Sequence, residues 1–127
     1  MTEADRTAAP SVETLASTLT IDITTIGRRS GKPARIEIWW FRVDGRFIIA
    51  GTPGPRDWYA NLVANDRIVV HVDGHDLVGT ATPVSDPEIR RAFFTDAQTS
   101  WYSDNAGLEA LVAHGPMVEV RLDGYAD

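Results

Sequence analysis

Hydrophobic and polar positions alternate with a period of two residues in parts of this chain. In the segment 18–27, Leu19, Ile21 and Ile23 are separated by polar residues. Such alternation is typical of a strand with one buried face. Residues 34–43 alternate likewise, and hairpin signals and apolar residues mark four further strand segments: 46–51, 67–72, 76–83 and 117–122. The pattern therefore predicts six strands.

Two Asp-Gly pairs mark the tightest turns between these strands. Asp44-Gly45 and Asp73-Gly74 each fall between two alternating segments, which predicts two-residue hairpins and antiparallel pairing. Helical patterns are confined to the connections. The expected fold class is mainly β, a six-stranded antiparallel barrel with helical decoration. We expect one domain over residues 1–127, with residues 1–12 as a flexible tail.

Three connections contain helical signals. In the first, a turn-rich loop leads to a helix with Trp58, Leu62 and Val63 on one side, and Asn65 is expected to end it in the left-handed conformation. A capping box at 85–88 predicts the second helix. Its expected buried residues are Ile89, Ala92 and Phe93. The third is expected to bury Leu108, Leu111 and Val112 and to end at His114.

Composition narrows the class of protein. With 127 residues, 43% of them apolar, the chain is long enough for one core. No apolar run approaches the ~20 residues of a membrane span, and no secretory signal is recognisable at the N-terminus. The chain has no cysteine, which excludes thiolate metal sites and fits a cytoplasmic protein. A net charge of −6 disfavours nucleic acid as a partner.

A cluster of cations stands out against this acidic background. Residues 24–32 read TTIGRRSGK, and the basic residues of the region are Arg28, Arg29, Lys32 and Arg35. Guanidinium groups and the N–H groups of a turn bind phosphate or carboxylate well, so an anionic ligand is one interpretation. The other is a solvated strand end whose arginines pair with surface carboxylates. The sequence has neither a P-loop nor a G-x-G-x-x-G motif, which excludes those nucleotide sites.

The segment 50–61, AGTPGPRDWYAN, suits a flat ligand. Gly51 and Gly54 allow the backbone to approach a ring closely, while Arg56 adds a cation and Trp58 an aromatic plane. An ordinary strand-to-helix turn is the alternative.

Together these motifs resemble the deazaflavin-dependent nitroreductase family. The resemblance covers residues 20–83 and rests on TTIGRRSGKP, the adjacent Trp39-Trp40 and AGTPGPRDWYANLVAND. These proteins are split β-barrel oxidoreductases of the FMN-binding, pyridoxamine-phosphate-oxidase-like fold that use coenzyme F420. The resemblance implies that the turn holds the phosphate and glutamyl tail of the cofactor through Arg28, Arg29, Ser30 and Lys32. It also implies a ring site formed by Ala50, Gly51, Thr52, Trp58 and Tyr59. Substrate-side aromatics would be Trp39, Trp101 and Tyr102.

Two departures from the family pattern affect the cofactor assignment. Ala34 stands where a basic residue is common, with Arg35 one place later, and Gly51-Thr52-Pro53-Gly54 replaces a lysine-containing Ser-Lys-Gly-Gly. Arg56 is a candidate to supply the missing charge. FMN therefore stays open as an alternative cofactor.

The resemblance implies an F420-dependent reductase. It would transfer a hydride to an electron-poor small molecule such as a quinone, a nitro compound or a conjugated enone, with solvent, Tyr102 or Tyr125 as the proton source. An FMN-dependent oxidase or reductase and a non-enzymatic F420 carrier are the alternatives. The chain is expected to be a monomer or a homodimer.

The remaining polar residues have simpler interpretations. His71, Asp73, His75 and Asp76 lie around a hairpin turn, so no metal site is expected there. His114 complements a helix end. We expect Arg90 and Arg91 to form a solvated helix face.

Overall fold

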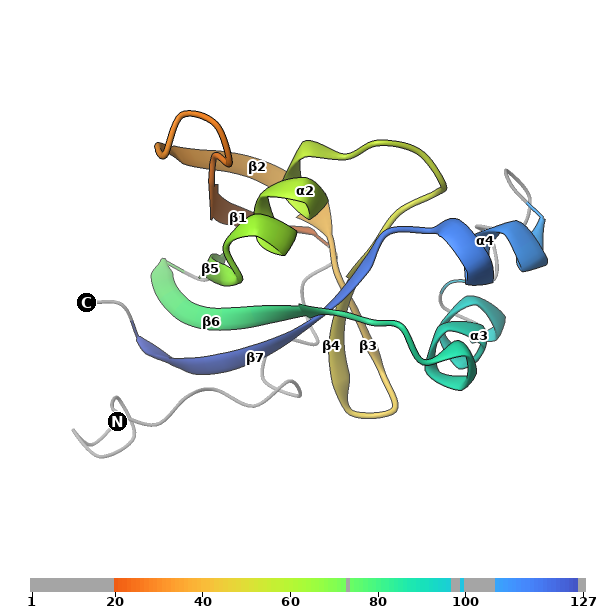
Figure 1. The fold of residues 1–127 in the computed structure, drawn as a ribbon. Coiled ribbons are helices and arrows are strands. Elements are labelled where there is room, and N and C mark those ends of the chain that lie inside the picture. The colour runs from red at the N-terminus through yellow and green to blue at the C-terminus, as the bar shows by residue number, and fades with distance from the viewer. Residues whose placement is uncertain (1–19, 73, 97–98, 100–106, 126–127) are drawn as a thin grey trace.

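A computed structural model describes residues 20–72, 74–96, 99 and 107–125. Among these, an antiparallel sheet curls into a barrel, α2 covers one end of it, and α3 and α4 lie together at its side (Figure 1). The strands are β1 (Thr20–Ile26), β2 (Pro33–Trp39), β3 (Phe41–Val43), β4 (Arg46–Ala50), β5 (Arg67–Val72), β6 (His75–Pro83) and β7 (Met117–Tyr125). The helices are α2 (Asp57–Ala64), α3 (Pro87–Thr95) and α4 (Leu108–His114). None of the described helices is long and apolar enough to cross a membrane.

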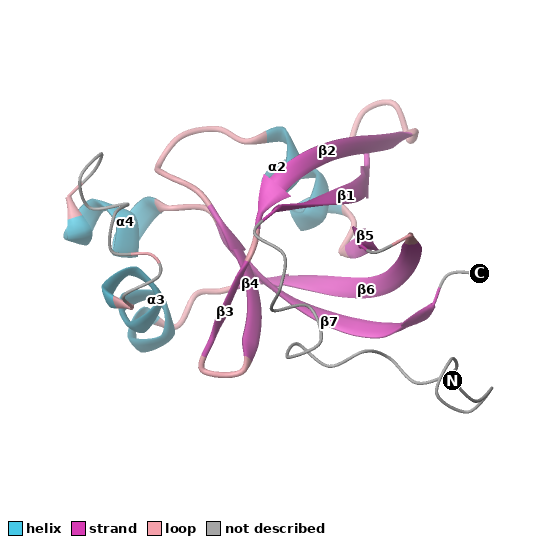
Figure 2. Ribbon diagram, turned by 180° about the vertical axis from the view of Figure 1, so that it is seen from behind, coloured by secondary structure: helices cyan, strands magenta, loops and turns pink. Residues whose placement is uncertain are grey.

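The described sheet has seven strands because one predicted strand is split. The strand order is β2-β1-β5-β6-β7-β4-β3, so the two edge strands are β2 and β3, which are consecutive in sequence. A single residue, Trp40, separates them. Its side chain is buried in the barrel, 5.0 Å between ring centroids from Phe47. The chain thus leaves one edge of the sheet and joins the other, which curls the sheet into a split barrel (Figure 2).

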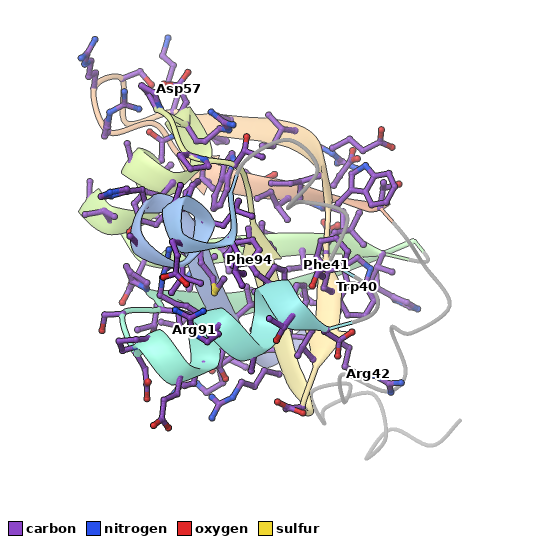
Figure 3. All side chains as sticks on the ribbon, turned by 90° about the vertical axis from the view of Figure 1, so that its right-hand side faces the viewer. Trp40, Phe41, Arg42, Asp57, Arg91 and Phe94 are labelled. Carbon is purple, nitrogen blue, oxygen red and sulfur yellow. The ribbon has the colours of Figure 1, made fainter. Side chains whose placement is uncertain are left out.

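Two hydrophobic cores lie on opposite faces of the sheet. The first fills the barrel with Ile and Val side chains from β1 and β5 and with Leu77 and Ala81 of β6, and the α2 residues Trp58 and Leu62 close it. The second lies outside the barrel, where Phe93 and Phe94 of α3 and Leu111 of α4 pack on β3, β4 and β7. Figure 3 shows Phe94 and Phe41 between the sheet and these helices. The second core attaches both helices to the barrel.

The predicted hairpins are present. Val43 pairs with Arg46, and both turn residues have positive φ, 53° at Asp44 and 74° at Gly45, as a type I′ turn requires. In the second hairpin Val72 pairs with His75 and Gly74 has φ 75°, while Asp73 lies outside the described residues. The two Asp-Gly signals therefore predicted the pairing correctly.

Some details of the predicted helices are wrong. Asn65 ends α2 in an extended conformation, φ −148°, with its N–H bound to the carbonyl of Asn61 at 2.8 Å. Val63 is 58% exposed, because the buried face of α2 consists of Trp58, Asn61 and Leu62. The polar Asn61 takes this buried place because its amide is hydrogen bonded to Thr25.

The predicted face of α3 is also wrong. The helix begins after Asp86, whose Oδ1 accepts the N–H of Glu88 at 2.9 Å, rather than after Ser85. Its buried residues are Arg90, Phe93 and Phe94, whereas Ile89 is half-buried and Ala92 exposed. Helix α4 buries Leu111 and Val112 and ends at His114 as predicted.

Candidate functional site

The cation cluster forms a tight turn between β1 and β2, here called the cation turn (residues 27–32). The N–H of Gly27 donates to the carbonyl of Lys32 at 2.8 Å, and that of Gly31 donates to the carbonyl of Gly27 at 2.8 Å. Ser30 Oγ accepts the Lys32 N–H at 3.1 Å and lies 2.5 Å from where a Cβ on Gly27 would be. The turn is therefore fixed internally, and a side chain at position 27 would displace Ser30 Oγ.

Arg28 is directed at α2. Its backbone N–H and its Nη1 both donate to Asn61 Oδ1, at 3.1 and 3.0 Å, and its Nη2 donates to Asp57 Oδ1 at 3.2 Å. Asn61 in turn donates from Nδ2 to Thr25 Oγ1 at 3.1 Å, so its amide joins both elements. Arg28 thus ties the cation turn to α2, and its guanidinium is largely occupied by the protein.

Arg29 and Lys32 are different. Both are exposed, and neither side chain makes a hydrogen bond or ion pair with any residue that the structure describes. Arg35 is committed elsewhere, since its Nε donates to Asp22 Oδ2 at 2.8 Å. Within the cluster, Arg29 and Lys32 are therefore the cations available to a ligand.

The cation turn lies beside the first turn of α2 (Figure 3, near Asp57). No side chain caps this helix at Arg56, so the first N–H groups of α2 lack a side-chain acceptor. Uncapped helix N-termini attract anions through these N–H groups and the helix dipole. Asp57 opposes that attraction, but its carboxylate is paired with Arg28.

The loop after β4 is held by Arg56. Its Nη2 donates to the carbonyl and to Oγ1 of Thr52, at 3.2 and 2.9 Å, and its Nη1 donates to the carbonyl of Pro55 at 2.9 Å. Gly54 has φ 134°, a conformation that side chains rarely adopt. At Gly51 a Cβ would meet its nearest neighbours at 3.5 Å, an ordinary contact. Arg56 therefore stabilises the loop, and three of its hydrogen bonds are made within it.

A cleft of about 610 Å³ opens beyond this loop. It lies between the loop, α2, the connection from β6 to α3, and the end of α4. The residues lining it are Gly54, Tyr59, Val84, Ser85, Pro87, Arg90, Val112, Ala113, His114, Gly115 and Pro116. Gly51 adjoins the cleft, because its N–H donates to the carbonyl of Pro116 at 3.0 Å. A largely apolar cleft with a few polar groups is the usual form of a small-molecule site.

Arg90 corrects the prediction of a solvated face. Its side chain is buried, with 8% of the residue exposed, and it donates to backbone carbonyls of Val112 (2.5 Å), Val84 (2.9 Å), Leu111 (3.1 Å) and Gly115 (2.5 Å). Burial lowers the pKa of Arg90, while the nearby Tyr59 counteracts part of that shift. The neighbouring Arg91 is exposed, as predicted. Its Nη1 and Nη2 donate to the two carboxylate oxygens of Glu109, each at 2.9 Å.

The other predicted ring and substrate residues are dispersed. Trp58 is 8% exposed within the barrel core and packs edge-on against Tyr59, with ring centroids 5.9 Å apart. Ala50 is buried in the outer core, so both lie behind the surface rather than on it. Trp39 is 47% exposed at the split between β2 and β3 and does not line the cleft; a core position for it is excluded. Trp101, Tyr102 and the side chain of Tyr125 lie outside the described residues.

Sequence reasoning missed one wall of the cleft. The carbonyls and side chains from Val112 to Pro116 form this wall, and the signal for it was the His-Gly-Pro sequence that ends α4. His114 was interpreted as a helix end, and it is exposed at the cleft. Nothing in the sequence indicates that Arg90 lines the cleft, because a polar residue on a helix predicts exposure.

His71 has a structural environment. Its Nδ1 lies 2.7 Å from Asp76 Oδ1, and its Nε2 lies 2.7 Å from Thr24 Oγ1. Over the described part of the chain, no group of three or more His, Cys, Asp or Glu side chains is placed to hold a metal ion. His71 instead links three adjacent strands.

Solved structures of similar fold support the barrel assignment. An F420-H2 dependent reductase is 20% identical, with a TM-score of 0.60, and the alignment covers 81% of this chain and 94% of that one. A Clostridium acetobutylicum protein of the pyridoxine phosphate oxidase family, related to a general stress protein, is 19% identical, with a TM-score of 0.63 and coverage of 87% and 79%. A chain described as a domain-swapped dimer is 20% identical, with a TM-score of 0.61 and coverage of 81% and 80%.

These likenesses confirm the split β-barrel fold. The family is shown independently, because the model of the F420H(2)-dependent quinone reductase family matches residues 2–107, most of the chain. This protein therefore belongs to the F420H(2)-dependent quinone reductases, oxidoreductases whose cofactor is coenzyme F420.

Proposed function

We propose that this protein reduces a quinone-type acceptor bound in the cleft, with the anionic tail of F420 held by Arg29 and Lys32. The observation that carries the proposal is that some of these cations are bonded to the protein while others are available to a ligand. The side chains of Arg28 and Arg56 are hydrogen bonded to the protein, whereas those of Arg29 and Lys32 have no partner among the described residues and lie beside the uncapped start of α2. Free cations at such a site favour a ligand with several negative charges.

The residues present fit F420. Its phosphate and glutamyl carboxylates would meet Arg29, Lys32 and the first N–H groups of α2, and its ring would cross the loop at Gly51 toward the cleft. Bound there, the cofactor supplies a hydride. Arg56 keeps this loop in one conformation, which reduces the entropy lost on binding.

The cleft is suited to a neutral acceptor with exposed oxygens. Among its lining residues there is no carboxylate, so carbonyl or nitro oxygens meet no like charge. Tyr59, Ser85 and His114 provide polar groups, and the apolar surface comes mainly from valine and proline side chains. The family description supports a quinone; nitro compounds and conjugated enones share the same electron-poor character and are proposed as further acceptors.

The test is anaerobic oxidation of reduced F420 by a naphthoquinone, followed through the deazaflavin absorbance at about 420 nm. We expect turnover with the wild-type protein, and a loss of F420 affinity without a loss of folding in a variant that combines Arg29→Ala and Lys32→Ala. Tight F420 binding without turnover on any quinone, nitro compound or enone would support a carrier instead.

FMN is a second candidate cofactor, because a neighbour of similar fold is assigned to the pyridoxine phosphate oxidase family. FMN carries a single phosphate and no glutamyl tail, so it would use fewer of the available donors. Parallel titration of the same protein with both cofactors separates the two candidates.

We also propose that the protein forms a homodimer. A neighbour of similar fold is described as a domain-swapped dimer, and the edge strand β2 of this chain exposes Ile36 (38%) and Trp39 (47%). Large exposed apolar side chains on a sheet edge favour association. Light scattering after size-exclusion chromatography should give twice the monomer mass of 13.9 kDa, whereas the monomer mass would refute the proposal.

A further inference from the structure

We propose that Tyr59 and Arg90 form an oxyanion site in the cleft, which stabilises the negatively charged oxygen that appears on the acceptor when it receives a hydride. This inference rests on the proposed function and identifies the residues that would act on the substrate. Tyr59 would be the group that touches the acceptor. Arg90 would be a positioning residue that supplies a fixed positive charge beside it.

The first observation is that the charge of Arg90 is not neutralised by an acid. Its four hydrogen bonds all go to backbone carbonyls, and within the described part of the chain no carboxylate is paired with it. Buried arginines are usually paired with an acidic group. Carbonyl dipoles hold this guanidinium in place while leaving its net charge at the edge of the cleft.

The second observation concerns the donors of Arg90. A guanidinium has five N–H groups. Nε gives one bond, Nη2 gives two and Nη1 gives one, so one N–H of Nη1 has no described acceptor. Arg90 also lines the cleft, so its charge lies next to the space that a ligand would occupy.

The third observation is the position of Tyr59. Its side chain lines the same cleft, and its hydroxyl makes no hydrogen bond to a residue that the structure describes. The phenol lies close enough to Arg90 to raise the pKa of that guanidinium, against the larger lowering by burial. The edge-on packing against the buried Trp58 fixes the plane of its ring. A ring held in this way keeps the hydroxyl in one position relative to the cleft wall.

The chemistry requires such a site. Transfer of a hydride to a neutral quinone adds two electrons and one hydrogen nucleus, and the product is a hydroquinone monoanion whose charge is on oxygen. One proton from solvent then gives the neutral hydroquinone. Donors aimed at the developing oxyanion stabilise the transition state more than the neutral substrate, so they raise kcat rather than lower KM.

The decisive variant is Tyr59→Phe, which keeps the ring and removes the hydroxyl. We expect kcat for a naphthoquinone to fall about 10- to 100-fold with little change in KM or in F420 affinity. The control is Val63→Ala, an exposed position on the same helix, which should leave all three values unchanged. A Tyr59→Phe enzyme with wild-type kcat would overturn the inference while leaving the proposed function intact. A wild-type protein inactive with every quinone would overturn the proposed function itself.

Two variants of Arg90 separate its charge from its structural contacts. Arg90→Lys retains the charge, whereas Arg90→Gln retains only neutral donors, and each loses part of the carbonyl network. If the charge acts on the acceptor, kcat should be about 10-fold higher in the lysine variant than in the glutamine variant of equal melting temperature. Equal kcat values would overturn the role of the charge.

Inhibitor binding gives a readout that does not depend on these variants folding equally well. A hydroxynaphthoquinone that is an anion at neutral pH mimics the charged product. Tyr59→Phe should weaken its binding about 10-fold while leaving the KM of the uncharged parent quinone unchanged. If the anion and the neutral quinone lose affinity equally, Tyr59 is a packing residue and the oxyanion site is refuted.

Discussion

The cation turn and the cleft use arginine in opposite ways. At the turn, cations gather in sequence on an exposed surface, and Arg29 and Lys32 keep their charges free of protein partners among the described residues. At the cleft, Arg90 is buried and bound by four backbone carbonyls. The difference teaches that a visible cluster of charges can divide its roles: Arg28, within that cluster, is as structural as Arg90.

The two regions also differ in the free energy needed to remove their charges from water. Removing a guanidinium from water is unfavourable, which is why burial lowers the pKa of Arg90. Exposed cations carry little such cost and contribute little to stability until a ligand arrives. Substitutions in the two regions should therefore affect different measurements, stability at the cleft and affinity at the turn.

The largest expected effect is on stability. Arg90→Met should lower the free energy of unfolding by about 3 to 5 kcal/mol, because it leaves buried carbonyls at the end of α4 without donors. Urea denaturation measures this loss. The adjacent Arg91→Met is the control, since its side chain is exposed and its melting temperature should stay close to wild type. Similar losses in both variants would remove the distinction between the two arginines.

The next effect is on cofactor affinity. Combining Arg29→Ala with Lys32→Ala should weaken F420 binding by about 2 to 3 kcal/mol. The difference in affinity between wild type and variant should shrink at high salt, because salt screens the attraction that the two cations add in the wild type. The unfolding free energy should change by less than about 0.5 kcal/mol. Arg35→Ala serves as the control, because Arg35 is paired with Asp22. If Arg35→Ala lowers F420 affinity as much as the double variant does, the claim that Arg29 and Lys32 are the cations that hold the cofactor is wrong.

Alternation of residues predicted the barrel because strands such as β1 and β5 have one face in the core, and the Asp-Gly pairs predicted both hairpins. The apolar positions change from even (Ile36, Ile38) to odd (Phe41, Val43) across the adjacent aromatic residues, and this change of phase was not interpreted as a split at Trp40. The buried face of α3 was predicted wrongly because a polar residue on a helix predicts exposure. The acceptors that allow Arg90 to be buried are backbone carbonyls, and the residue types in the sequence do not reveal them. For the same reason the cation cluster was visible, but the anchoring of Arg28 by Asn61 was not.

A smaller effect should separate Arg28 from its neighbours in the cation turn. Arg28→Ala should cost about 1 to 2 kcal/mol of stability, because it removes the side-chain bond to the buried Asn61. A double-mutant cycle with Asn61→Ala measures the coupling, expected to be about 0.5 to 1 kcal/mol. Additive effects of the two substitutions would contradict a tie between the turn and α2.

The smallest effect concerns the pair that joins α3 to α4. The hydrogen bond and charge of Arg91 lower the pKa of Glu109 below its ordinary value of 4.5. A lowered carboxyl pKa contributes stability above the unfolded-state pKa, and this contribution is lost as the pH falls through the folded-state value. Glu109→Gln should therefore lower the melting temperature slightly at pH 7 and leave it unchanged well below pH 4. A difference that grows as the pH falls would contradict the pairing.

Parallel titration of the wild-type protein and the Arg29→Ala, Lys32→Ala variant with F420 and with FMN tests the central claim most directly. The free cations and the uncapped start of α2 predict that wild type binds F420 at least about 10-fold more tightly than FMN. They also predict that the variant loses most of this preference. Tighter binding of FMN, or an F420 affinity that the double substitution leaves unchanged, would contradict the claim that these cations hold the cofactor.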